Sequence, residues 1–158
     1  MAKKLELQKE KILSAVQLFK RFDTSLPLNA VAVDEIAEQN AKIHYTAVEY
    51  DGHGVEDGRV RIRALFARPA GNGQVPAVLL LDDAGKTPDR ELVTYFAEKG
   101  YAVLAPDYSG KKSQGDDNST VYPPSLSYAN YLEAGGLYDL SGGSAEKSCW
   151  FEWTYAAL

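Results

Sequence analysis

Two short turns carry the residue types best suited to chemistry. The first, DDAGKT, runs from Asp82 to Thr87 after an apolar stretch and before a helical pattern, and the second runs from Asp107 to Gly115 after another apolar stretch. In open sheets with parallel strands, ligands bind beyond the carboxyl ends of the strands, where both turns are expected. A glycine-bearing turn that opens a helix also presents main-chain amides to an anion. The chemistry indicated is therefore phosphate binding or stabilisation of an oxyanion.

The glycine pattern argues against the phosphate interpretation. The tripeptide Gly85-Lys86-Thr87 resembles the end of a nucleotide-binding P-loop, but Leu80 stands where that motif requires its first glycine. A turn without this glycine is too short to wrap a phosphate. No nucleotide or other cofactor is therefore expected.

Three carboxylates allow an alternative chemistry. Asp82 and Asp83 after the apolar stretch resemble the acidic pair of phosphoacceptor receiver domains, whose carboxylates hold Mg²⁺, and Asp107 would then be the phosphoacceptor. Only one strand–helix–strand crossing separates Asp107 from the pair, whereas a receiver requires a further helix and strand. The receiver interpretation is the less favoured one, and the favoured interpretation includes no metal.

A covalent nucleophile is not evident in the sequence. The segment from Gly142 to Glu146 approaches the nucleophile elbow G-x-S-x-G, but Glu146 replaces the last glycine, so Ser144 is predicted to be the N-cap of a helix. Cys149 is predicted to be a packed small residue. His44 and His53 stand in and beside the early strands, and the residues around them do not form a metal-ligand motif.

Composition narrows the class of protein. The 158 residues contain 17 Lys and Arg, 22 Asp and Glu and one Cys, for a net charge of -5. A negative chain lacks general affinity for nucleic-acid backbones, and one Cys forms no internal disulfide. No apolar run reaches the ~20 residues that a membrane span needs, and the charged N-terminus is not a secretory signal. These features predict a single globular domain in the cytoplasm, with no nucleic-acid or membrane partner.

The first part of the chain changes from a helical to a strand-like period. Residues 3–21 have the spacing of an amphipathic helix, and a shorter helix is predicted over residues 32–39. Residues 44–50 and 59–68 alternate apolar and polar positions, and the glycine-rich residues 51–58 are predicted to join them as a hairpin loop.

The middle of the chain predicts a strand–helix–strand unit. Residues 75–81 form a continuous apolar run, typical of a strand buried on both faces. Residues 88–99 are predicted to be a helix that starts at a proline and ends before Gly100, and residues 102–105 form the next strand. Residues 108–143 show little periodicity and are predicted to form a long binding loop. Residues 145–158 are predicted to form a helix without a C-terminal cap, so the chain is expected to be truncated there.

This order of elements resembles the N-terminal part of α/β-hydrolases. The resemblance covers residues 43–158 and is strongest to the acetyl xylan esterase and dienelactone hydrolase branch. It rests on the hairpin, the strand in RPAGNGQVPAVLLL, the DDAGK turn, the helix ending AEKGYAVLAPDY, a Gly/Ser-rich loop and the SCWFEWTYAAL helix. The fold class expected is α/β: a partial hydrolase-type sheet, with a hairpin, a parallel βαβ unit and N-terminal helices, truncated before the nucleophile strand.

The resemblance also implies roles for particular residues. Ala84 would donate an oxyanion-hole N–H, although the usual His-Gly of the family is replaced by Asp82-Asp83. The remaining substrate-pocket candidates are Asp82, Asp83, Gly85, Asp107 and Tyr108, and Gly110, Ser113 and Gly115 match a loop that borders the active site. The nucleophilic serine, the acid and the catalytic histidine would follow later in the chain, and this sequence lacks the motif that carries the serine.

These inferences lead to a preferred function and its alternative. We expect an N-terminal helical extension over residues 1–42 and a hydrolase part over residues 43–158, which in a complete enzyme acts on a small-molecule ester. The alternative is a non-catalytic scaffold or interaction module. An unfinished parallel sheet leaves an apolar edge, so a homo-oligomer could form through that edge or through the N-terminal helix.

Overall fold

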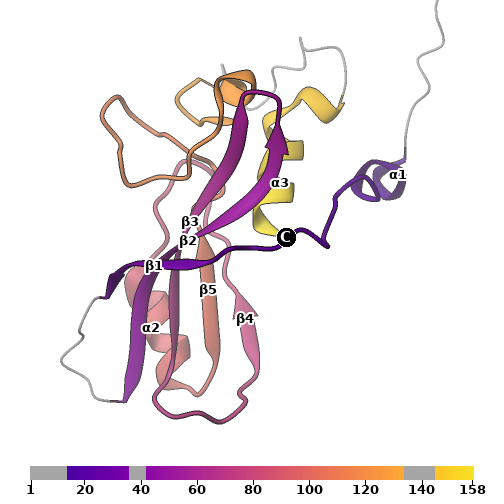
Figure 1. Cartoon of the computed structure of the whole chain (residues 1–158). Helices are drawn as coiled ribbons and strands as arrows, with labels where there is room; N and C mark the ends of the chain where they lie inside the picture. The colour runs from indigo at the N-terminus through magenta and orange to yellow at the C-terminus, as the bar shows by residue number, and fades with distance from the viewer. Residues whose placement is uncertain (1–13, 36–41, 134–144) are drawn as a thin grey trace, which may run out of the picture.

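The computed structural model describes residues 14–35, 42–133 and 145–158. A five-stranded mixed sheet has the order β1-β2-β3-β5-β4, with α2 on one face and α3 beside the β2–β3 hairpin (Figure 1). The elements are α1 (Ala15–Phe19), β1 (Val31–Glu35), β2 (Ile43–Val55), β3 (Gly58–Pro69), β4 (Ala77–Leu79), α2 (Arg90–Glu98), β5 (Ala102–Pro106), η1 (Pro124–Ala129), η2 (Ala145–Lys147) and α3 (Cys149–Ala157). None of the described helices has the length and hydropathy needed to cross a membrane.

The hairpin forms as predicted but with a much shorter turn. β2 and β3 pair antiparallel from Ile43↔Pro69 to Val55↔Gly58, so most of the expected loop is strand. A bulge between Asp51 and Gly54 shifts the register, because two residues of β2 lie opposite one of β3. Bulges accommodate glycine well, which is why a glycine-rich segment remains within the ladder.

The helix predicted over residues 32–39 is wrong in its described part. Residues 31–35 form β1, which pairs antiparallel with β2 through Val31↔Glu49 and Glu35↔Thr46. The sequence VAVDE places β-branched valines at alternate positions, a pattern that suits a strand when a partner edge is available. Residues 36–41 of the same prediction, and residues 3–13 of the N-terminal helix, lie outside the described residues.

The predicted strand–helix–strand unit is confirmed. β4 and β5 pair in parallel, with Ala77 opposite Ala102, and α2 makes the connection. Asp89 is the N-cap of α2, and its carboxylate accepts the amides of Glu91 and Leu92. α2 buries Val93 and Ala97 against one sheet face. The core cluster there consists of Ile43, Tyr45, Ala67, Val93, Ala97, Val103 and Ala105.

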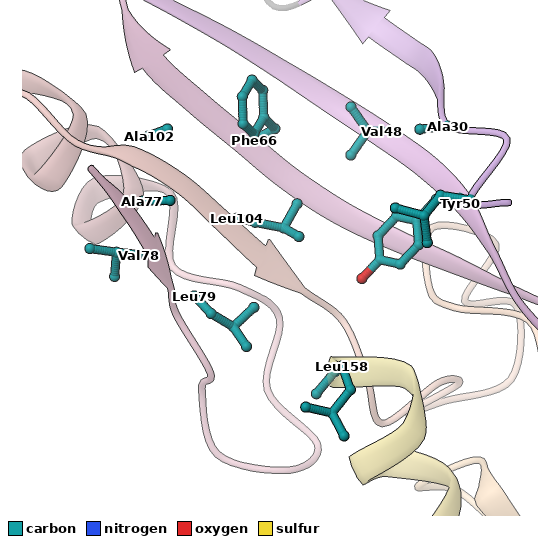
Figure 2. A pocket seen from close by; sticks show the side chains of 12 residues that line it. Ala30, Val48, Tyr50, Phe66, Ala77, Val78, Leu79, Ala102, Leu104 and Leu158 are labelled. Carbon is teal, nitrogen blue, oxygen red and sulfur yellow. The ribbon is translucent and has the colours of Figure 1, made fainter. Parts of the chain in front are cut away.

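β4 differs from the prediction in its burial. It is the last described strand of the sheet, and one of its faces is open, because Ala77 and Leu79 on that face are exposed, Leu79 by 47%. Next to it, the face of the sheet opposite α2 holds an apolar groove of about 690 Å³ (Figure 2). Phe66 and Leu104 form its floor, and Leu158 borders one end. The groove and the unpaired edge of β4 are therefore continuous.

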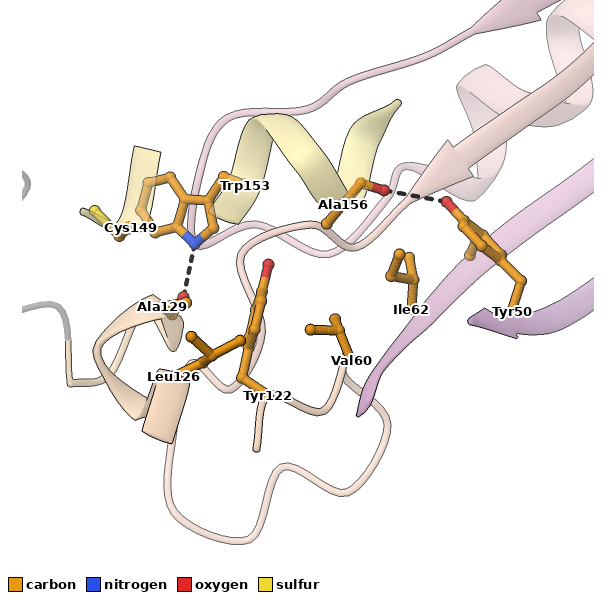
Figure 3. Close-up of a cluster of buried hydrophobic side chains, with 10 residues drawn as sticks. Tyr50, Val60, Ile62, Tyr122, Leu126, Ala129, Cys149, Trp153 and Ala156 are labelled. Carbon is orange, nitrogen blue, oxygen red and sulfur yellow. Dashed lines mark hydrogen bonds between the residues drawn. The ribbon is translucent and has the colours of Figure 1, made fainter. Parts of the chain in front are cut away.

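A second core cluster lies under α3 (Figure 3). Trp153 is its largest member, and its indole Nε1 donates to the Ala129 carbonyl of η1 at 2.6 Å. The other buried members are Tyr50, Val60, Ile62, Ala64, Tyr122, Leu126, Ala129, Cys149 and Ala156. The helix begins at Cys149 with Ser148 as its N-cap, and Ser144, the predicted cap, lies outside the described residues. A 3₁₀ turn over residues 145–147 takes up the intervening chain.

Candidate functional site

The two turns singled out in the sequence meet at the carboxyl edge of β4 and β5. Both strands run in the same direction, so the turns after Leu79 and after Pro106 leave the sheet side by side. Tyr108 donates its hydroxyl hydrogen bond to the Asp82 carbonyl, and the Gly85 amide donates to Ser109 Oγ at 3.0 Å. Two side chains that follow β5 thus hold the turn that follows β4.

The main-chain amides of the first turn differ in what they bind. The Asp83 amide donates to its neighbour's carboxylate, Asp82 Oδ1, at 2.8 Å, and the Lys86 amide donates to the Asp83 carbonyl at 3.0 Å. The Gly85 amide is taken by Ser109. Within the described ranges, only the amide of Ala84 among these four has no hydrogen-bond acceptor. This is the amide that the sequence predicted to face an oxyanion.

A tyrosine ring lies directly over this turn. Gly85 has a φ of +82°, and a Cβ added there would lie 2.6 Å from the ring of Tyr131. The amide of Tyr131 donates to the Ser109 carbonyl at 2.8 Å, which fixes the ring above the glycine. The close approach requires glycine at this position. Tyr131 therefore forms one wall of the site, which sequence reasoning missed because Tyr131 lies 46 residues after Gly85, in a segment without sequence periodicity.

The two aspartates of the turn do not form a metal centre. Asp83 is exposed and pairs with Lys86, Oδ2 to Nζ at 2.7 Å, and the Lys86 hydrogen bond lowers the pKa of Asp83. Across the described residues, no group of three His, Cys, Asp or Glu side chains could hold a metal ion. The sheet also contains three antiparallel strand pairs, whereas receiver domains have a parallel sheet. Both observations count against the receiver alternative.

Asp107 is buried in the loop and not open to a substrate. Its side chain is 5% exposed and accepts from Lys112 Nζ at 2.7 Å and from the Thr120 amide at 3.4 Å. Burial raises the pKa of Asp107, while the hydrogen bond from Lys112 lowers it. The carboxylate thus anchors the loop between β5 and η1. The neighbouring Tyr108 keeps its place at the turn, and desolvation raises the pKa of its phenol.

His53 has a partner that the sequence did not indicate. Its Nε2 lies 3.3 Å from Glu152 Oε2 on α3, about one hundred positions later in the chain. The only unusual feature of the sequence at this pair is that Glu152 is the one charged residue in the apolar helix CWFEWTYAA. Cys149 behaves as expected: it is buried, and burial raises the pKa of its thiol.

Comparisons with known proteins find similar folds among solved structures. The sequence matches no protein-family model, and no curated protein matches it. Among solved structures, it resembles the acetyl xylan esterase from Paenibacillus sp. R4, with a TM-score of 0.57 and 20% identity over 83% of this chain and 39% of that one. It also resembles acetyl xylan esterase 1 from Thermoanaerobacterium sp. JW/SL YS485, with a TM-score of 0.52 and 17% identity over 87% of this chain and 41% of that one.

These likenesses define the architecture. The chain has a partial α/β-hydrolase fold, and the mixed sheet with its single parallel crossing agrees with that class. It spans about 40% of the length of the two esterases it resembles. The turn between β4 and α2 follows a parallel strand and precedes its crossover helix.

Proposed function

We propose that this chain is the oxyanion-hole part of a cytoplasmic carboxylic-ester hydrolase of the acetyl xylan esterase and dienelactone hydrolase branch. The single observation that carries the proposal is the turn from Asp82 to Lys86. It follows β4 at the carboxyl edge of the sheet, and its Ala84 amide is without an acceptor in the described structure. The substrate class is a small-molecule ester.

The turn would contribute charge stabilisation to an acyl transfer. When a serine attacks the ester carbonyl, the oxygen becomes an anion that fixed N–H donors stabilise. Ala84 supplies one donor, and the amide that follows the nucleophile supplies the other in this fold. The 158 residues contain no G-x-S-x-G, so polypeptide outside this sequence would supply the nucleophile and the catalytic histidine. The hydrogen bonds from Tyr108 and Gly85 keep the turn in position before the reaction.

The proposal predicts that the 158-residue chain alone does not hydrolyse small acyl esters. An oxyanion donor without a nucleophile stabilises charge but does not start acyl transfer. The measurement is release of p-nitrophenol from its acetate ester, with buffer and heat-unfolded chain as controls. Turnover above both controls would contradict the proposal that the nucleophile lies outside this sequence.

A chimera tests whether the Ala84 amide acts as an oxyanion donor. Residues 43–133 would replace the matching segment of the Paenibacillus esterase, which keeps its own later residues. In a folded, active chimera, Ala84→Pro removes the N–H and is expected to lower kcat about 100-fold with little change in KM. Ala84→Gly keeps the amide and serves as the matched control. Equal activity of both variants would exclude Ala84 as an oxyanion donor.

The second candidate is a module that binds a different protein, not a second copy of this chain, through the apolar groove. Leu79 and Leu158 are exposed at its borders, and an unpaired strand edge of this kind is a site for association. If the module interpretation holds, light scattering shows a stable, folded monomer that stays monomeric at high concentration. If the chain is part of a hydrolase, we expect self-association that Leu79→Lys reduces, with Leu92→Lys on the face of α2 as the control.

A further inference from the structure

A buried carboxylate on α3 is paired with a histidine of the β2–β3 hairpin. Glu152 is 3% exposed, although it lies in an otherwise apolar helix. Its Oε2 lies 3.3 Å from His53 Nε2, an ion-pair distance without hydrogen-bond alignment, and its Oε1 accepts from the Tyr128 hydroxyl of η1 at 3.3 Å. Three elements distant in sequence therefore meet at one carboxyl group.

The hairpin is shaped to bring the histidine there. His53 lies in the bulge of β2, where the register shifts between Asp51 and Gly54. Its ring stacks on Tyr155, one turn further along α3, with centroids 4.5 Å apart and planes at 5°. The imidazole is thus held by α3 at two positions, which is more than an incidental surface contact requires.

The groups around this carboxylate leave His53 as its cationic neighbour. The hydroxyls of Tyr128 in η1 and of Tyr122 in the loop before it lie near Glu152, and the Cys149 thiol of α3 lies near the same two tyrosines. All of these are neutral donors at physiological pH. Among the described residues, His53 is the one cationic partner of Glu152. Burial raises the pKa of Glu152 to about 7 and lowers that of His53.

We propose that His53 and Glu152, held at ion-pair distance, carry one proton between the two of them near neutral pH and act as a pH-sensitive clamp that holds α3 against the hairpin. With one proton the pair is neutral overall, whether as acid and imidazole or as carboxylate and imidazolium. A second proton buries a net positive charge, and loss of the first buries a net negative charge. Burial of an unbalanced charge is costly, so either change loosens α3.

The clamp reaches the candidate site through the next residue of the helix. Trp153 lies edge-on to Tyr108, with centroids 6.0 Å apart, and stacks with Tyr131 at 6.4 Å. Both tyrosines contact the turn that holds Ala84. A shift of α3 would therefore displace a wall of the site. The clamp itself does not depend on the proposed ester chemistry.

The direction of the pH effect follows from the two groups. Glu152 has a raised pKa in the folded state, so its contribution to stability is lost as pH rises from about 4.5 to about 7. His53 has a lowered pKa, so its contribution is lost as pH falls below 6.5. In the native pair the changes of stability with pH from the two groups oppose each other just below pH 6.5. A variant that removes one of the two groups should show the change of folding stability with pH that the other group causes.

The first experiment follows the native chain by NMR and fluorescence. The chain has two histidines, so the imidazole signal of His53 is assigned with His44→Gln, which removes the exposed histidine of the same strand. We expect the His53 signal to titrate in two steps, as a coupled pair does, and tryptophan fluorescence to change in the same steps. A single step at the pH of free imidazole, with unchanged fluorescence, would overturn the proposal.

The second experiment compares thermal unfolding of variants from pH 4.5 to 8.5. Relative to the native chain, Glu152→Gln is expected to gain about 5 °C in Tm as pH rises across this range. His53→Gln is expected to show the opposite trend, because it leaves Glu152 without its cationic partner. His44→Gln is expected to follow the native profile. If the profile of the double variant, Glu152→Gln with His53→Gln, equals the sum of the two single changes, the two groups titrate independently and the clamp is excluded.

Discussion

Replacing Trp153 with alanine is expected to destabilise the chain by about 4 kcal/mol, the middle of the range for large aromatic residues in a core. The indole is 2% exposed and contacts the rings of Tyr108, Tyr131 and Trp150. Its truncation leaves a cavity and also leaves the Ala129 carbonyl without its donor. Urea unfolding followed by far-UV circular dichroism gives the free energy of unfolding.

Trp150 provides the matched control for this measurement. It lies on the same helix, but its side chain is 48% exposed, so Trp150→Ala is expected to cost about 1 kcal/mol, mainly from the lost edge contact with Trp153. If the two variants were equally stable, α3 would not be packed on η1 as described. Because Trp153 packs on Tyr108 and Tyr131, which contact the turn of Ala84, its loss is expected to increase hydrogen exchange in that turn.

The parts of the fold that the sequence predicted are those with a strong local pattern. α2 has an aspartate N-cap, an apolar stripe and a closing glycine at Gly100, and each of these signals concerns neighbouring residues. β5 is a short apolar run that stops at Pro106. The parallel crossing then follows from element order alone, because a strand, a helix and a strand within 30 residues pack in one way.

The errors arise where a distant partner decides the structure. Residues 31–35 form a strand because the edge of β2 is available, and the sequence of β1 itself permits either state. The apolar run around β4 indicated burial on both faces, but burial depends on what covers a strand, and here β4 is an edge. Apolar content alone does not distinguish these two cases.

The candidate site shows the same division between local and distant signals. The position of the turn from Asp82 to Lys86 followed from its place between a strand and a helix. The burial of Asp107 did not, because Lys112 and Thr120 approach it through loop geometry. The partner of His53 lies on α3, so no spacing in the sequence could have indicated it.

Replacing Lys112 with methionine is expected to cost about 3 kcal/mol, because it leaves Asp107 as a buried carboxylate without a cation. Lys112 Nζ donates both to Asp107 and to the Gly110 carbonyl, so the variant also leaves that carbonyl unpaired. The pKa of Asp107 is already raised by burial, and loss of Lys112 raises it further. The destabilisation should therefore grow as pH rises above the unfolded value of 3.8 and shrink in acid.

A double variant separates the buried charge from the lost packing. Asp107→Asn keeps an oxygen that accepts from the Thr120 amide but carries no charge, so Lys112→Met with Asp107→Asn is expected to recover most of the stability at pH 7. The recovered stability should also lose its dependence on pH between 4 and 7, which a urea titration at several pH values measures. If the double variant were as unstable as Lys112→Met alone, the lysine would act through its aliphatic packing, and Asp107 would not be the electrostatic anchor of the loop.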